Sequence, residues 1–178
     1  MTLASKITLA RILLIPLFMV FMYLSGGQQG VWLWVAFGTF ILASITDYVD
    51  GEIARRMNQI TDFGKFLDPL ADKVLVMAAL VIFTEWQWFP SWALMVVLTR
   101  ELAVTGLRLV SAGKGKVIAA GWSGKIKTAS TMVGICVMMA FPAQIWLRWV
   151  AIVVIVGTTL YSGVEYFIQN INCIWNRE

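Results

Sequence analysis

The stretch Ile12–Thr46 reads ILLIPLFMVFMYLSGGQQGVWLWVAFGTFILASIT and contains no charged side chain. One bilayer crossing takes about 20 consecutive apolar residues, so this stretch is long enough for more than one crossing. Its middle segment, Ser25–Gly30, consists mostly of glycine and glutamine, and such a cluster favours a turn. We therefore expect the stretch to form two membrane helices joined by a short loop.

The composition of the whole chain is also that of a membrane protein. The 178 residues are 60% hydrophobic and 13% charged, and the mean hydropathy is +0.79. Soluble domains average about 45–50% apolar and about 25% charged residues, so we exclude a soluble enzyme, a disordered region and a nucleic-acid-binding module. The chain has no histidine, which excludes histidine bases and most zinc sites. Cys136 and Cys173 are too few for a disulfide framework.

Further charge-poor segments follow along the chain, at 74–84, 86–99, 128–147 and 149–164. Pro90 separates the first two of them, and Pro142 falls near the break between the last two helices that we expect. We predict an all-α integral membrane protein that forms a single domain, residues 1–178, with six transmembrane helices. The expected spans are about 8–24, 31–56, 66–84, 90–110, 126–142 and 147–169.

Positive charge collects on one side of this topology. Six crossings put both termini on the same side of the membrane, and of the 14 Lys and Arg residues only Arg148 falls on the opposite side. The others lie in or beside the terminal segments and the connections after the second and fourth helices: Lys6, Arg11, Arg55, Arg56, Lys65, Lys73, Arg100, Arg108, Lys114, Lys116, Lys125, Lys127 and Arg177. The positive-inside rule therefore predicts cytoplasmic termini.

Four aspartates, Asp47, Asp50, Asp68 and Asp72, lie near the cytoplasmic ends of the second and third expected helices. Each costs about 2.5–3.5 kcal/mol in a membrane helix on insertion scales and therefore needs an explanation. At about 100° per residue, the members of each pair share one helix face, and antiparallel neighbouring helices would bring the pairs face to face. Carboxylates without nearby histidine or thiolate form an oxygen-only site that suits Mg²⁺ or Mn²⁺, and two ions fit such a site.

Glycines accompany these acids at helical spacing. Two stripes at i, i+4 and i+8 combine them: Asp47–Gly51–Arg55 and Gly64–Asp68–Asp72. A glycine beside an acid lets a phosphate or a sugar approach the backbone, and a fixed arginine at the end of a stripe favours an anion. The spacing therefore indicates a site for a phosphorylated ligand.

Structural roles are the alternatives for these acids. Asp68 before Pro69 fits a helix N-cap followed by proline at the first helical position. Asp47 or Asp50 could pair with an arginine one or two turns further on, as an anchor of the topology. Two other functions also remain open, a divalent-cation transporter and a non-catalytic scaffold. The transporter is disfavoured because the acids cluster at one membrane face, with no second set to form an exit path.

The acids belong to a longer pattern: Asp47-Tyr-Val-Asp50-Gly51-Glu-Ile-Ala54-Arg55, eight residues, then Gly64-Lys-Phe-Leu-Asp68-Pro-Leu-Ala-Asp72. This pattern resembles the signature of the CDP-alcohol phosphotransferase family at every defining position. Chain length, six helices and motif placement agree as well, so the resemblance covers nearly the whole chain. The segments 99–108, 124–128 and 162–166 are most similar to bacterial members whose acceptor alcohol is glycerol 3-phosphate.

The resemblance implies an activity. Members of the family transfer the phosphatidyl group of CDP-diacylglycerol to an alcohol and release CMP. The match implies that Asp47, Asp50, Asp68 and Asp72 bind the metal ions, and that Asp72 also takes the proton from the acceptor hydroxyl. It further implies a homodimer in the bacterial cytoplasmic membrane, with the active site facing the cytoplasm. Siblings that use serine, inositol phosphate or phosphatidylglycerol would share the same acids and remain the alternative.

The resemblance assigns the cytidine diphosphate pocket to Gly51, Ala54, Arg55 and Gly64. Glycerol 3-phosphate is a dianion that needs cations of its own, and the candidates are Arg108, Lys125 and Lys127. The two lysines open an expected helix, whose N-terminal amides favour anions. Arg100 lies deep enough in the expected fourth helix to suggest a functional role. A structural ion pair with a nearby acid explains its position equally well.

Overall fold

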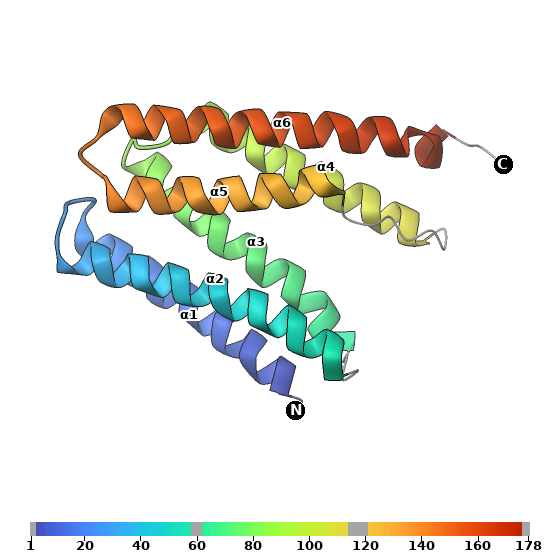
Figure 1. Ribbon diagram of the computed structural model, residues 1–178, viewed down its shortest axis with the longest axis horizontal. Helices are drawn as coiled ribbons and strands as arrows, with labels where there is room; N and C mark the ends of the chain where they lie inside the picture. Colours follow the sequence, from blue (N-terminus) through green and yellow to red (C-terminus); the bar gives the residue numbers. More distant parts are fainter. Residues whose placement is uncertain (1–2, 58–61, 114–120, 176–178) are drawn as a thin grey trace. The chain divides into compact units, whose positions relative to one another are not determined.

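The computed structural model describes the backbone of residues 3–57, 62–113 and 121–175, and the side chains of residues 13–46, 73–108, 111 and 121–169. This part of the chain contains six helices and no strand (Figure 1). Their bounds are α1 Leu3–Ser25, α2 Val31–Met57, α3 Asp62–Glu85, α4 Ser91–Gly113, α5 Trp122–Ala140 and α6 Ile145–Trp175. The prediction of an all-helical protein with six helices is confirmed for the described residues.

Several helices extend beyond the predicted spans. α1 begins at Leu3 instead of residue 8, α3 at Asp62 instead of 66, and α5 at Trp122 instead of 126. Hydropathy marks where a helix is apolar, whereas these helices begin a turn or more earlier, in segments that mix apolar, polar and charged residues. Because Asp68 lies well inside α3, its interpretation as an N-cap residue is wrong.

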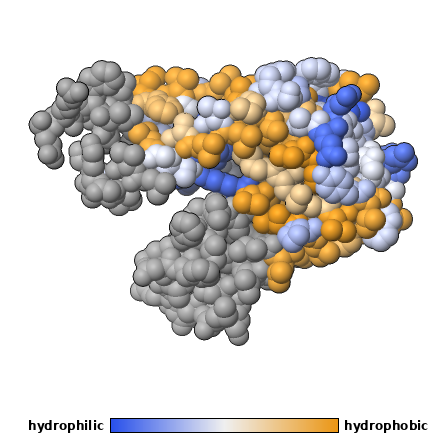
Figure 2. Space-filling model, turned by 180° about the vertical axis from the view of Figure 1, so that it is seen from behind, coloured by the Kyte–Doolittle hydropathy of each residue, from blue (hydrophilic) through white to orange (hydrophobic). Residues whose placement is uncertain are grey.

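One helix is long and apolar enough to cross a membrane among the described residues, the Ile145–Gln169 part of α6. The apolar segments Leu13–Ser25 and Val31–Thr46 are shorter. Figure 2 shows apolar residues over most of the described surface on the face it displays. Large apolar side chains are exposed along α6, among them Val153 and Ile168. These features are typical of a surface in contact with lipid, and six crossings remain a prediction.

Contacts along the chain divide it into two compact units, Met1–Trp86 with Met139–Ala143, and Gln87–Met138 with Gln144–Glu178. The first contains α1, α2 and α3, and α1 packs against both of the others. Phe18 of α1 and Phe40 of α2 are fully buried, with ring centroids 5.6 Å apart. This aromatic pair is part of the α1–α2 contact.

The predicted turn after α1 is confirmed. Gly26 and Gly27 have φ angles of 57° and 73°, in the left-handed region that glycine enters without steric cost. The Gly26 N–H donates to the Tyr23 carbonyl over 3.1 Å, which closes the end of the helix. Tyr23 also donates from its hydroxyl to Glu85 over 2.8 Å, so the last turns of α1 and α3 are joined.

The second unit contains α4, α5 and α6. Gly134 allows α5 to approach α6 closely, because a Cβ built on it would lie 2.7 Å from Ile155 Cδ1. The hydroxyls of Ser130 and Thr158 lie 2.9 Å apart and form a hydrogen bond between the same two helices. α6 also packs along α4, and this contact positions the polar side chains described next.

Candidate functional site

All eight positions of the acid-and-glycine signature lie on helices. Asp47, Asp50, Gly51, Ala54 and Arg55 belong to α2, and Gly64, Asp68 and Asp72 belong to α3. The two helices contact each other within the first unit. The side chains of residues 47–72 are outside the described residues, so the face-to-face arrangement of the acids stays a prediction.

The donor set on α2 and α3 fits a hard divalent ion. Four carboxylates supply only oxygen ligands, which Mg²⁺ and Mn²⁺ prefer, and their separation into two pairs on consecutive helices allows ligands from both. Among the side chains that the structure describes, no group of three His, Cys, Asp or Glu could hold a metal ion. The quartet in residues 47–72 is therefore the candidate metal centre.

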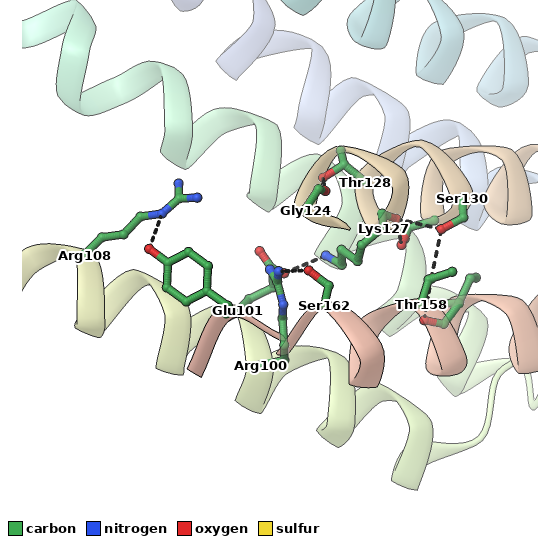
Figure 3. A network of polar contacts seen from close by, with 12 residues as sticks. Arg100, Glu101, Arg108, Gly124, Lys127, Thr128, Ser130, Thr158 and Ser162 are labelled. Atoms are coloured by element: carbon green, nitrogen blue, oxygen red, sulfur yellow. Dashed lines mark hydrogen bonds and ion pairs between the residues drawn. The ribbon is translucent and has the colours of Figure 1, made fainter. Parts of the chain in front are cut away.

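A cluster of charged side chains joins the three helices of the second unit (Figure 3). Its centre is Glu101 on α4, whose Oε1 accepts hydrogen bonds from Lys127 Nζ over 2.6 Å and from Arg100 Nη1 over 2.8 Å. Arg100 Nη2 also donates to Ser162 Oγ on α6 over 2.6 Å. We call these four residues the Glu101 cluster.

The Glu101 cluster is largely removed from solvent. The side chains of Arg100 and Glu101 are 12% exposed, and that of Lys127 is 6% exposed. Two cations share one carboxylate, so the cluster carries a formal excess of one positive charge. Charges buried to this degree are tolerated when they are paired and hydrogen-bonded, as Glu101 is on both sides. The interpretation of Arg100 as the partner of a nearby acid is confirmed.

Gly163 leaves room for the side chain of Arg100. A Cβ built on Gly163 would lie 3.2 Å from Arg100 Cγ, so a larger residue would push the aliphatic part of the arginine away. The adjacent Ser162 is buried and accepts the hydrogen bond described above. Residues 162–163 therefore fix this arginine through one polar and one steric contact.

Arg108 is held by the same stretch of α6. Its Nε donates to the Tyr166 hydroxyl over 3.1 Å, and its Cζ lies 5.5 Å from the centroid of the Tyr166 ring. Tyr166 is 6% exposed and packs with Val104 and Leu107 of α4, whereas Arg108 itself is exposed. In Figure 3 Arg108 lies to one side of the Glu101 cluster.

The two lysines proposed for the acceptor phosphate have different environments. Lys125 is exposed, with Nζ 5.2 Å from the ring centroid of Trp122. Lys127 is buried against Glu101, a partner that the sequence did not predict. Because α5 begins at Trp122, Lys127 also lies beyond its first turn and away from the free N-terminal amides. Arg108 and Lys125 are thus the exposed members of the predicted trio.

Sequence reasoning assigned no role to Glu101, Ser162 or Tyr166 individually. The contacts between helices join residues 26 to 62 positions apart along the chain, so no short-range spacing reveals them, whereas Arg100 and Glu101 are neighbours in sequence. The available signal was general: a charged residue inside an apolar helix needs a polar partner on a neighbouring helix. Which partner it finds depends on how the helices are rotated about their axes.

Most of the chain matches a known protein family. A family model described as CDP-alcohol phosphatidyltransferase matches residues 1–157. The chain therefore belongs to the CDP-alcohol phosphatidyltransferase family, and the resemblance inferred from the signature is confirmed.

Several bacterial proteins are similar to this chain over most of its length. The chain is 45% identical, over 186 aligned positions covering 94% of each protein, to a Bacillus subtilis protein named CDP-diacylglycerol–glycerol-3-phosphate 3-phosphatidyltransferase. A Salmonella typhimurium protein of the same name is 38% identical over 91% of each chain. A Mycobacterium tuberculosis protein named probable phosphatidylglycerophosphate synthase is 38% identical over 92% of this chain and 79% of its own length. The similarity covers more than 90% of this chain in each case.

Proposed function

We propose that this chain transfers the phosphatidyl group of CDP-diacylglycerol to sn-glycerol 3-phosphate, giving phosphatidylglycerophosphate and CMP. The observation that carries the proposal is the 45% identity, over 94% of both chains, to a bacterial protein named for this reaction. The complete signature on α2 and α3 supports the same chemistry. The enzyme is a transferase of phospholipid biosynthesis.

The acids supply the reaction centre in this proposal. Asp47, Asp50 and Asp68, together with Asp72, would hold the divalent ions, Mg²⁺ or Mn²⁺ and two in number. Such ions, when bound, neutralise the charge of the diphosphate and of departing CMP. Asp72 takes the proton from the glycerol hydroxyl while that oxygen bonds to the β-phosphorus and the bond from this phosphorus to the CMP oxygen breaks. Phosphoryl transfer depends mostly on positioning and electrostatics, which this arrangement provides.

Different residues are assigned to the two substrates. Gly51, Ala54, Arg55 and Gly64 shape the cytidine diphosphate pocket. Arg108 and Lys125 bind the phosphate of the acceptor directly, and their exposure supports that role. Lys127 contributes positive charge from within the Glu101 cluster, which is formally positive. A dianionic acceptor is thereby attracted without competing for the metal ligands.

The proposal also includes the membrane arrangement. The chain is a single multi-pass domain in the bacterial cytoplasmic membrane, with six crossings, cytoplasmic termini and the acid site at the cytoplasmic face. The apolar α6 supports a location in the membrane, and the asymmetric distribution of Lys and Arg supports the orientation. The protein works as a homodimer, which rests on the family resemblance alone. A site at this interface lets a lipid substrate arrive laterally and a soluble one from water.

A CMP-release assay tests the proposal. The purified protein in lipid nanodiscs receives CDP-diacylglycerol and, in separate reactions, glycerol 3-phosphate, serine, inositol phosphate or phosphatidylglycerol. We expect CMP with glycerol 3-phosphate alone, loss of the reaction with EDTA, and recovery on adding Mg²⁺ or Mn²⁺. Preference for another acceptor would identify a sibling enzyme and overturn the assigned substrate.

A second measurement separates the enzyme from a transporter. Protein reconstituted in liposomes without nucleotide lipid is supplied with external Mn²⁺, and ion entry is followed with a trapped fluorescent indicator. We expect no uptake above that of protein-free liposomes. Rapid uptake in the absence of CDP-diacylglycerol would favour transport as the function of the acids.

A further inference from the structure

Arg108 and Tyr166 form a pair in which one nitrogen of the guanidinium is occupied. Arg108 uses Nε to donate to the Tyr166 hydroxyl over 3.1 Å. An arginine presents five N–H donors in a planar fork, and four of them belong to the two terminal nitrogens. Within the described residues no carboxylate pairs with those nitrogens. The contact therefore orients the guanidinium and, among the described side chains, leaves its outer edge available.

The buried environment of Tyr166 makes it a rigid support for the side chain of Arg108. Its ring is buried with Val104 and Leu107, so the hydroxyl is held at a defined place beside α4. Arg108 is exposed and would otherwise sample many rotamers. A buried aromatic ring with two side-chain torsions gives the flexible cation one preferred orientation.

The partners of Arg100 and Arg108 differ in charge, and this difference indicates which arginine can bind an anionic ligand. α6 holds both arginines of α4, one through Ser162 and the other through Tyr166. Arg100 is paired with Glu101, and its charge is already compensated in a largely buried position. Arg108 is exposed, and its partner among the described side chains is the uncharged Tyr166. No carboxylate among those side chains compensates its positive charge.

We propose that Tyr166 is a positioning residue that orients the Arg108 guanidinium for two-point binding of the phosphate of glycerol 3-phosphate. This inference rests on the proposed function, because it assumes that Arg108 meets the acceptor. A guanidinium whose Nε is already bonded offers its two terminal nitrogens to two phosphate oxygens in parallel. Orientation before binding lowers the entropy lost when the acceptor arrives.

The variant Tyr166→Phe tests the role, because it keeps the ring and its packing and removes only the hydroxyl. We expect the KM for glycerol 3-phosphate to rise about three- to tenfold, which is the range for losing one hydrogen bond of ordinary strength. The kcat and the KM for CDP-diacylglycerol should change by less than about twofold. A purely structural role would instead lower the thermal midpoint and affect both substrates alike.

The matched control is Tyr161→Phe, on the same helix. Tyr161 is 68% exposed and shows no hydrogen bond within the described residues, so loss of its hydroxyl should leave both KM values unchanged. A double-mutant comparison with Arg108→Lys supplies the second readout. Lysine has no Nε donor, so Tyr166→Phe should have no additional effect on the KM for glycerol 3-phosphate in the Arg108→Lys background.

The outcomes separate this inference from the proposed function. An unchanged KM for glycerol 3-phosphate in Tyr166→Phe, or additive effects of the two substitutions, would overturn the role of Tyr166 while the wild-type reaction stands. The absence of acceptor-dependent CMP release in the wild-type protein would overturn the proposed function, and this inference with it. An equal rise of both KM values would show that Tyr166 only supports the fold.

Discussion

Replacing Asp72 by asparagine should reduce CMP release by a factor of about 10²–10⁴, the usual contribution of a general base. Asparagine has nearly the same size as aspartate but cannot accept the hydroxyl proton at neutral pH, and it is a weaker ligand for a divalent ion. α3 should still form, because the change adds no bulk to its helical backbone. The measurement is the initial rate of CMP release with saturating substrates in nanodiscs.

Asp62→Asn is the matched control for this variant. Asp62 is the first residue of the same helix and lies outside the signature, so its substitution should leave the rate within about twofold. Membrane insertion and thermal midpoint should match the wild type in both variants. A wild-type rate in Asp72→Asn would contradict the assigned base and revive the non-catalytic scaffold.

Replacing Glu101 by glutamine should have the largest effect on stability. Glutamine removes the negative charge that Arg100 and Lys127 share, and it leaves two cations close together in a site where the side chains are at most 12% exposed. Removal of one partner from a buried ion pair costs about 3–5 kcal/mol in the free energy of unfolding. For a chain of this size we expect the thermal midpoint to fall by about 10 °C.

Glu165→Gln provides the comparison for Glu101→Gln. Glu165 on α6 accepts a hydrogen bond from Gln169 over 2.9 Å, one turn further along the same helix and at the exposed surface. Its substitution should change the free energy of unfolding by less than about 0.5 kcal/mol. The midpoints are read from tryptophan fluorescence in one detergent. Equal, small shifts in the two variants would show that the Glu101 cluster contributes little to stability.

The helices could be predicted from the sequence because long uncharged stretches and the glycine-rich turn after Ser25 set their order. The starts of α3 and α5 could not be placed, since each helix begins about one turn before its apolar part, in a segment that mixes apolar, polar and charged residues. The N-cap interpretation of Asp68 failed for this reason. Proline after Asp68 resembles a helix start, yet the helix begins at Asp62 and accommodates the proline inside.

The candidate site was predictable where its residues are neighbours in sequence. The signature occupies two consecutive helices, and its spacing alone indicated a metal-dependent site for a phosphorylated ligand. The second unit behaved differently, because Lys127 meets Glu101 and Arg108 meets Tyr166 across separate helices. Those pairs depend on helix rotation and on side-chain length, which a periodic pattern does not specify.

The length of α6 has a consequence for the depth at which the Arg108–Tyr166 pair would lie in a membrane. With 31 residues the helix is about 46 Å long, whereas a hydrocarbon core is about 30 Å thick. In the proposed topology Ile145 lies at the outer boundary, and Tyr166, about 32 Å further along the axis, then lies level with the inner one. Bilayer thickness would then set how far the Arg108 guanidinium reaches into the headgroup layer.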